Sequence, residues 1–97
     1  MTGCQGQIGV PLVKALCAEL GSENVLASDK SDQMFDLPCN FQQLDVTNES
    51  QYMTMVKENK VNYIVHMAGI LSALGEKNPD LAVDVNVNGV INALRAA

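Results

Sequence analysis

The chain has 97 residues, of which 47% are hydrophobic and 18% charged, and 11 Asp and Glu against 6 Lys and Arg give a net charge of −5. A chain this short holds one small domain, and a hydrophobic share near the globular average argues against a disordered tail. Because the acidic balance offers no basic footprint, the composition argues against a nucleic-acid or anionic-membrane partner.

The first predicted element is an amphipathic helix from Gln7 to Leu20. Apolar residues recur there every four positions and form one stripe: Ile8, Leu12, Leu16 and Leu20. Pro11 falls in the first turn, where its missing N–H has no intrahelical partner. Gly21 supplies a stop signal after the last apolar position.

Three short runs are predicted strands, namely residues 25–29, 41–45 and 61–66. The first two end in an acid, Asp29 and Asp45. Because short apolar runs alternate with helical periodicity, the sequence predicts an α/β fold, with a Rossmann-like parallel sheet and flanking helices.

Two further helices are marked by their caps. Asn48, with Gln51 three residues on, resembles a capping box, and the helix it opens is expected to reach about Lys57 or Asn59. The pair 78–79, Asn-Pro, opens the second helix, which carries four apolar residues: Leu81, Val85, Ile91 and Leu94. Gly89 interrupts that helix, and we expect another backbone to approach it closely.

Both ends of the sequence suggest a partial domain. Only Met1 and Thr2 precede Gly3, where a parallel fold would place a whole strand, and the last helix reaches Ala97 without a cap. We therefore expect residues 1–97 to be a Rossmann domain truncated at both ends, with the first strand largely missing and no substrate domain. No targeting segment or bilayer-spanning run is visible, and the compartment is left open between cytoplasm and mitochondrion.

The run from Gly3 to Gly9 is a Gly-x-x-Gly-x-x-Gly loop that opens directly into the first helix. Gly3 allows a tight turn, Gly6 allows close approach to a phosphate, and Gly9 allows the helix to lie against its strand. The amino end of the helix presents unpaired N–H groups and a positive dipole to a pyrophosphate. A simple glycine-rich turn is the alternative interpretation of this loop.

Asp29 shifts the balance toward dinucleotide binding. It lies 20 residues after Gly9, at the end of the next predicted strand, where a carboxylate can accept both ribose hydroxyls of an adenosine. The same charge would repel a 2′-phosphate, so the sequence favours NAD over NADP. Lys30 could offset some of that charge, although a solvated lysine is the simpler interpretation.

The remaining candidates are less specific. Asp45 ends a strand where an adenine edge would lie, but it could equally be an ordinary acid before a helix. Ala68 and Gly69 would let a cofactor lie flat on the backbone. His66 has no paired nucleophile or metal partner, so we interpret it as a packed strand histidine rather than a catalytic base.

The sulfur-containing residues are assigned no chemistry. Met53, Met55 and Met67 are expected to fill the core. The odd set of three cysteines is too widely spaced for a zinc knuckle or redox pair, so we expect reduced thiols and no metal site: Cys4, Cys17 and Cys39.

Several motifs together resemble the extended short-chain dehydrogenase/reductase superfamily, and within it the L-threonine 3-dehydrogenase family. They comprise the glycine loop from Thr2 to Gly9, Ala-Ser-Asp at 27–29, Leu-Asp-Val-Thr at 44–47, HMAGILSALGEK at 66–77, and Asn-Val-Asn-Gly at 86–89 followed by Asn-Ala-Leu at 92–94. The resemblance spans almost the whole chain, and AGILSA followed by GEK is its most particular part.

The resemblance implies NAD as cofactor and L-threonine as substrate, oxidised to 2-amino-3-oxobutanoate, in a protein that could be a homodimer. By resemblance, the pyrophosphate would be held by Gly3, Gly6, Gln7, Ile8 and Gly9. The adenosine would be held by Asp29, Lys30, Asp45 and Val46, and the rest of the cofactor would be lined by Met67, Ala68, Gly69, Ile70 and Leu71. Ser72 would face the substrate, although it could simply bond its own backbone.

One departure limits the catalytic interpretation. The Tyr-x-x-x-Lys pair of the superfamily is absent, because Val56 follows Tyr52 by four residues and Met67 follows Tyr63. We therefore expect this chain to be inactive alone, as the amino-terminal NAD-binding part of a dehydrogenase. A nucleotide-sugar epimerase or dehydratase of the same superfamily, or a non-catalytic NAD-binding module, is the alternative.

Overall fold

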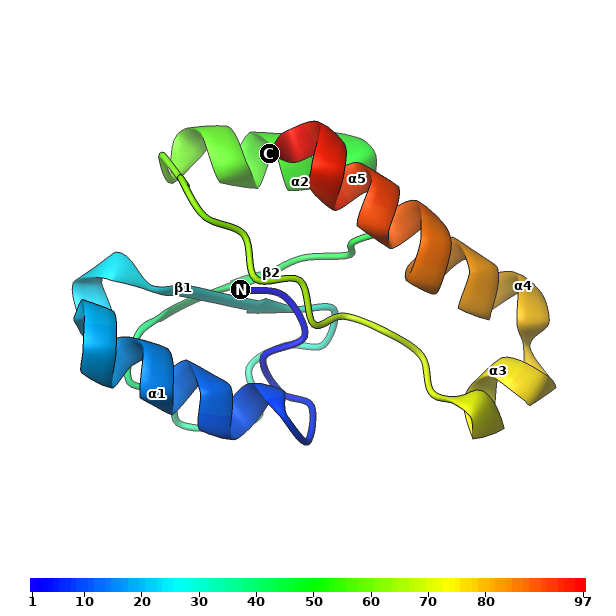
Figure 1. The fold of residues 1–97 in the computed structure, drawn as a ribbon, viewed down its shortest axis with the longest axis horizontal. Coiled ribbons are helices and arrows are strands. Elements are labelled where there is room, and N and C mark those ends of the chain that lie inside the picture. Colours follow the sequence, from blue (N-terminus) through cyan, green and yellow to red (C-terminus); the bar gives the residue numbers. More distant parts are fainter.

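Two parallel strands form the sheet of the computed structural model, which describes residues 1–97 (Figure 1). Strand β1 (Leu26–Asp29) and strand β2 (Asn40–Gln43) pair in register, from Leu26 opposite Asn40 to Asp29 opposite Gln43. Strand β2 ends two residues before the predicted boundary, and the next N–H, that of Leu44, donates to the Asp29 carbonyl at 2.8 Å. The α/β class and the parallel pairing are as predicted.

Two extended segments continue this layer on the free side of β1. The Ser28 N–H donates to the Met1 carbonyl at 2.9 Å, and the Cys4 N–H donates to the Ser28 carbonyl at 3.1 Å. On the other side, Thr2 forms a parallel bridge with His66. The spatial order is therefore β2, β1, residues 1–4, and residues 65–67, which is the order of the first half of a doubly wound sheet.

The predicted strand over residues 61–66 is wrong as an element, because only one bridge forms. Thr2 donates to the Val65 carbonyl at 2.9 Å and accepts from the Met67 N–H at 3.3 Å. After Thr2 the neighbouring segment turns away at Gly3, whose φ is 65°. With no longer partner beside it, the 61–66 run stays extended but unpaired along most of its length.

Helix α1 (Gly9–Leu20) covers one face of the sheet, and helices α2 and α5 cover the other (Figure 1). The buried face of α1 is Gly9, Val13 and Cys17, one position on from the predicted stripe. The ends of that stripe are exposed, since Ile8 is 63% and Leu20 55% accessible. Gly21 ends the helix as expected, with φ 89° and its N–H bonded to the Cys17 carbonyl, and the 3₁₀ turn η1 (Ser22–Asn24) follows.

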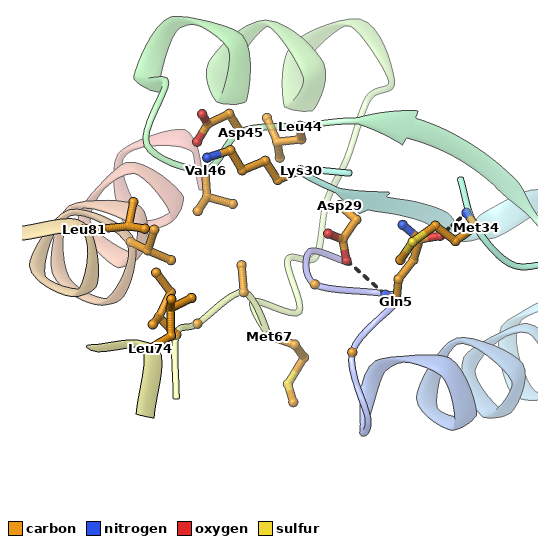
Figure 2. A pocket seen from close by; sticks show the side chains of 16 residues that line it. Gln5, Asp29, Lys30, Met34, Leu44, Asp45, Val46, Met67, Leu74 and Leu81 are labelled. Carbon is orange, nitrogen blue, oxygen red and sulfur yellow. Dashed lines mark hydrogen bonds between the residues drawn. The ribbon is translucent and has the colours of Figure 1, made fainter. Parts of the chain in front are cut away.

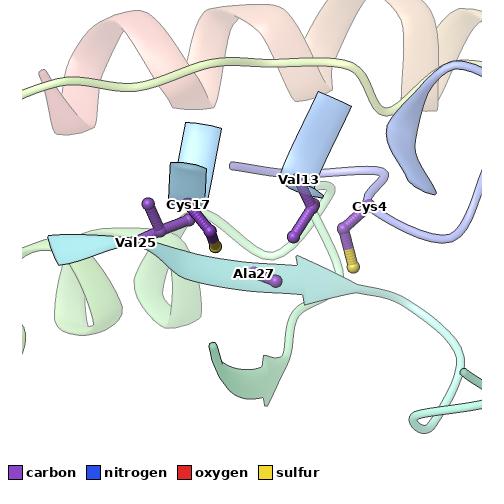
Figure 3. Packing of buried hydrophobic residues seen from close by; sticks show 5 residues of the cluster. All are labelled: Cys4, Val13, Cys17, Val25 and Ala27. Atoms are coloured by element: carbon purple, nitrogen blue, oxygen red, sulfur yellow. The ribbon is translucent and has the colours of Figure 1, made fainter. Parts of the chain in front are cut away.

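The core between α1 and the sheet is a cluster of five buried residues drawn in Figure 3: Cys4, Val13, Cys17, Val25 and Ala27. Cys39 packs against this cluster, and all three cysteines are free thiols. No group of His, Cys, Asp and Glu side chains is arranged to hold a metal ion.

Helix α2 (Glu49–Glu58) starts at the predicted cap, because Asn48 Oδ1 accepts from the Gln51 N–H at 3.0 Å. The Gln51 side chain does not complete the capping box; its amide bonds the Asp45 N–H and the Gln43 carbonyl instead. Met53 on this helix is 46% exposed, so the expectation that it fills the core is wrong, whereas Met55 packs against a second buried cluster.

That second cluster joins α2 to α5 and to the segment after β2, through Leu44, Val46, Tyr52 and Ala93. Helix α5 (Gly89–Ala96) buries Gly89, Asn92 and Ala93. The predicted apolar positions on this helix lie elsewhere: Ile91 is partly and Leu94 largely exposed. The close neighbour of Gly89 is a side chain and not the expected backbone, because a Cβ added there would lie 2.9 Å from Val46 Cγ2.

The remaining helical segments lead into α5. Helix α3 (Ser72–Lys77) follows the loop of residues 67–71. Helix α4 (Pro79–Val83) begins at the predicted cap, with Asn78 Oδ1 accepting from Leu81 N–H at 3.3 Å and a proline in its first turn. A π-helical turn, η2 (Asp84–Asn88), connects α4 to α5. None of the helices has both the length and the apolar character needed to cross a bilayer.

Candidate functional site

A cavity of about 420 Å³ opens at the carboxyl ends of the parallel segments. In Figure 2, Leu74 and Leu81 lie on one side of it, with Gln5, Asp29 and Met34 on the opposite side. The lining residues are Gly3, Gln5, Gly6, Asp29, Lys30, Met34, Leu44, Asp45, Val46, Met67, Ala68, Gly69, Ile70, Leu74, Leu81 and Val85. Its volume and mostly apolar walls are typical of a small-molecule site.

The glycine loop forms one wall because two of its glycines allow main-chain contact. Gly3 has φ 65°, and a Cβ there would lie 2.7 Å from the backbone N of Ala68. A Cβ on Gly9 would lie 2.2 Å from the Gly3 carbonyl oxygen, so the start of α1 presses directly on the loop. Any side chain at either position would force these backbone segments apart.

The amino end of α1 is free to bind an anion. The N–H groups of Gln7, Ile8 and Gly9 have no acceptor within the protein, and no acidic side chain occupies the first turn. These donors follow directly after Gly6, which lines the cavity. Unpaired N–H groups and the helix dipole together favour a phosphate here.

Asp29 ends β1 beside this loop. One carboxylate oxygen, Oδ2, accepts the Gln5 N–H at 3.0 Å, and Oδ1 has no donor from the protein. The side chain is only partly buried and lines the cavity. A carboxylate with one oxygen held and the other free can accept hydroxyl groups from a ligand in the cavity.

Asp45 lines the cavity above Lys30 (Figure 2). Its Oδ1 accepts both the Thr47 hydroxyl at 2.7 Å and the Thr47 N–H at 3.0 Å. The hydroxyl bond is the main cause of a lowered Asp45 pKa, with the Thr47 N–H and the Lys30 charge adding to it against partial burial. The neighbouring Val46 is fixed by its carbonyl, which accepts from Asn92 Nδ2 at 2.9 Å.

The loop after the Thr2 bridge forms the third wall. Thr2 Oγ1 accepts the Met67 and Ala68 N–H groups at 3.2 and 3.3 Å. Further along, Asn86 grips Ile70 at both backbone groups, accepting its N–H at 2.7 Å and donating to its carbonyl at 3.0 Å. The side chains of Thr2 and Asn86 thus fix the backbone of this loop, which lines the cavity.

His66 packs beneath the loop, outside the cavity lining, as expected for a packed histidine. Its Nδ1 lies 3.1 Å from both Thr2 Oγ1 and Tyr52 OH. Thr2 Oγ1 also accepts two N–H groups of the loop, and the other ring nitrogen of His66, Nε2, is buried without a hydrogen-bond partner. Burial, and secondarily the Met1 amine, lower the His66 pKa.

The structure brings ten of the predicted site residues together around the cavity: Gly3, Gly6, Asp29, Lys30, Asp45, Val46, Met67, Ala68, Gly69 and Ile70. It leaves Gln7, Ile8, Gly9, Leu71 and Ser72 outside the lining, with Leu71 82% exposed. Met67, which was also expected to fill the core, is 37% exposed at the cavity.

Six lining residues escaped the sequence analysis: Gln5, Met34, Leu44, Leu74, Leu81 and Val85. Gln5 carried a signal, because it lies within the glycine loop. Leu74, Leu81 and Val85 carried none, since only the packing of their helices brings them to the cavity. Asn86 is exposed and Asn92 is buried, and the role of each depends on a partner distant in sequence.

Comparison with known protein sequences shows the family of this chain. The family model described as "NAD dependent epimerase/dehydratase family" matches residues 1–97. An uncharacterized epimerase/dehydratase of Staphylococcus haemolyticus is 46% identical over 101 residues, covering 100% of this chain and 31% of that protein.

Solved structures are also similar. A monomeric L-threonine 3-dehydrogenase from a metagenome, in its apo form, has 43% identity and a TM-score of 0.93, covering 99% of this chain and 31% of that one. A Thermus thermophilus UDP-glucose 4-epimerase in complex with NAD has 26% identity and a TM-score of 0.83, covering 98% and 32%. The chain thus spans about a third of the length of these proteins.

Proposed function

This chain belongs to the NAD dependent epimerase/dehydratase family, and we propose that its cavity binds NAD as the cofactor-binding part of an oxidoreductase resembling L-threonine 3-dehydrogenase. The domain assignment of residues 1–97 as a partial NAD-binding Rossmann domain belongs to this proposal. One observation carries the cofactor: Asp29, with its free carboxylate oxygen, and Gly6 line the same cavity, and the unpaired amides at the start of α1 follow directly after Gly6 in the chain.

The residues present fit the adenosine diphosphate part of NAD. The glycine loop and the N–H groups of Gln7, Ile8 and Gly9 would hold the pyrophosphate. Asp29 Oδ1 would accept the ribose hydroxyls, with Lys30 beside it. Asp45 and Val46 would lie along the adenine, and the held backbone of Val46 gives that edge a fixed position.

The loop from Met67 to Leu71 would line the remaining cofactor, and Ser72 would contact the substrate. When bound, NAD would accept the hydride from the β-carbon of threonine, giving 2-amino-3-oxobutanoate. The supports are the 43% identity to an L-threonine 3-dehydrogenase and the AGILSA and GEK motifs. The residue that takes the hydroxyl proton is not among those proposed in this chain.

Calorimetric titration of the chain with NAD tests the cofactor site. We expect saturable binding, weakened about tenfold or more, a loss of at least ~1.4 kcal/mol, when Asp29→Asn removes the charge but keeps an acceptor for Gln5. NADP should bind the unsubstituted chain more weakly than NAD, because the Asp29 charge would repel the 2′-phosphate. Asp29→Asn should therefore reduce the difference in affinity between NAD and NADP. The absence of detectable heat at millimolar NAD would contradict the proposal.

The substrate is tested on the longer protein that carries this segment. A threonine-dependent rise in NADH absorbance is the expected result. Activity only on a nucleotide sugar would support the alternative, an epimerase or dehydratase, which the name of the Staphylococcus haemolyticus relative favours. NAD binding without turnover of either substrate class would support a non-catalytic module.

The assembly state is proposed only for the longer protein. By family resemblance we propose a homodimer, although the metagenome relative is described as monomeric. Light scattering after size-exclusion chromatography would distinguish the two. Neither composition nor structure favours cytoplasm over mitochondrion, and fractionation would assign the compartment.

A further inference from the structure

We propose that Gln5 is a positioning residue that holds the segment from Lys30 to Met34 in place as one wall of the cavity, and thereby raises affinity for the adenosine end of the cofactor. This inference rests on the proposed NAD site. The residue occupies a variable position of the Gly-x-x-Gly-x-x-Gly loop, where the glycine pattern alone assigns no role.

Gln5 forms hydrogen bonds to Asp29, Asp32 and Met34 through its backbone N–H and both polar atoms of its side chain. Its backbone N–H donates to Asp29 Oδ2 at 3.0 Å. Its side-chain Nε2 donates to the Asp32 carbonyl at 3.0 Å, and its Oε1 accepts the Met34 N–H. The side chain thus bridges two backbone groups almost thirty residues away in sequence.

The segment that Gln5 holds has little else to fix it. It contains no helix or strand, and residues 30–36 are all exposed, with Met34 65% accessible. Apart from those of Gln5, the hydrogen bond that ties this segment to the rest of the protein runs from Gln43 Nε2 to the Lys30 carbonyl. The other hydrogen bonds here are local: the Gln33 N–H donates to Asp32 Oδ1, and Gln33 Nε2 donates to the Phe35 carbonyl.

The position of this segment matters because Lys30 and Met34 both line the cavity. Figure 2 shows Gln5 and Met34 side by side on the wall that carries Asp29. The flexible, polarizable Met34 side chain can pack against the face of a bound adenosine. A wall held before binding spares the ligand the entropic cost of ordering it, so releasing Gln5 should weaken binding.

The experiment compares Gln5→Leu, which removes the amide but keeps the backbone N–H on Asp29, with Gln33→Leu as a matched control. The Gln33 side chain bonds only the nearby Phe35 carbonyl, and Gln33 does not line the cavity. Hydrogen exchange measured without ligand reports how well the Met34 amide is protected. The Leu44 amide, which donates to the Asp29 carbonyl at 2.8 Å, is the reference for an intact fold. Calorimetry with NAD and with ADP-ribose reports affinity.

We expect Gln5→Leu to lose protection at Met34 while Leu44 stays protected, and to bind both NAD and ADP-ribose about tenfold more weakly. Gln33→Leu should leave Met34 protection and both affinities unchanged. Retained protection at Met34, or lost protection with unchanged affinity, would overturn the inference. A loss of Leu44 protection together with Met34 would instead assign Gln5 a general structural role and also overturn it.

The outcome is separable from that of the proposed function. If the unsubstituted chain binds neither NAD nor ADP-ribose, the proposed function fails at that step, before any variant is compared. If the unsubstituted chain binds both and Gln5→Leu binds equally well, the NAD site stands and the role of Gln5 is rejected.

Discussion

Residues 1–48 and residues 49–97 form opposite sides of the cavity and are held in different ways. Of the 14 buried residues, 10 lie in the first region, where the sheet, α1 and the glycine loop meet through main-chain contacts. The second region has no named strand, and its segments are attached by side-chain amides that bond to backbone groups, as Asn86 does to Ile70 and Asn92 to Val46.

This difference predicts different sensitivities. In the first region, a Cβ at Gly3 or Gly9 would meet backbone atoms closer than 3.0 Å, because backbone lies against backbone there. In the second region no glycine lies this close to backbone, but the attachment depends on single polar atoms whose loss leaves a backbone group without a partner. The same kind of substitution should therefore have different effects on the two sides.

The largest expected effect is that of Gly9→Ala. The new Cβ would meet the Gly3 carbonyl oxygen at 2.2 Å, so the free energy of unfolding should fall by about 3 kcal/mol. Gly75→Ala in helix α3 is the matched control, since its Cβ would meet only Ala82 Cβ at 3.4 Å. That change should alter stability by less than about 1 kcal/mol, in the favourable direction. Urea unfolding measures both, and equal effects would contradict the comparison.

Asn92→Ala comes next. It removes the donor to the Val46 carbonyl and leaves a buried acceptor unpaired, so stability should fall by about 2 kcal/mol. Asn88→Ala removes a similar side chain from the same helical stretch, but the Asn88 side chain makes only an exposed hydrogen bond to the Asp84 carboxylate. Its effect should stay within about 0.5 kcal/mol. Chemical unfolding of both variants provides the test, and a similar loss for both would show that burial does not decide the cost.

Asn86→Ala should have a local effect of about 1 kcal/mol, because two hydrogen bonds to Ile70 are exposed to solvent. We expect faster hydrogen exchange at the Ile70 amide and little change at Tyr52, whose amide lies in α2. Unchanged exchange at Ile70 would mean that the loop from Met67 to Leu71 is held by Thr2 alone.

The smallest expected effect is a pH dependence at the junction of the two regions. Burial lowers the His66 pKa below its ordinary 6.5, and burial also lowers the pKa of the Met1 amine below its ordinary 8.0. The folded state therefore binds fewer protons than the unfolded state, and stability should fall as pH falls from about 8 through both lowered pKa values.

His66→Gln tests this assignment, because His66 is the only histidine. Unfolding measured between pH 5 and 8 should lose the part of the slope below 6.5 and keep the part that the Met1 amine contributes. An unchanged slope in the variant would assign the whole pH dependence to other groups.

Local physics in the sequence determined the α/β class, the start of α2 at Asn48, the stop at Gly21, and the glycine loop followed by Asp29. Each depends on residues within a few positions, where a cap, a left-handed turn or a hydrophobic period has one main outcome. That is why most of the predicted cofactor residues of the glycine loop, β1 and the Met67–Ile70 loop lie around one cavity.

Tertiary structure decided what depends on distant partners. The buried face of α1 is set by the sheet beneath it, and the 61–66 run forms one bridge because Thr2 is the only residue that pairs with it as a strand would. Gln5 and Asn92 are ordinary amides until the fold brings a backbone acceptor to them. A sequence pattern indicates which residues favour burial or can form a hydrogen bond. Which partner they meet is set by chain segments tens of residues away.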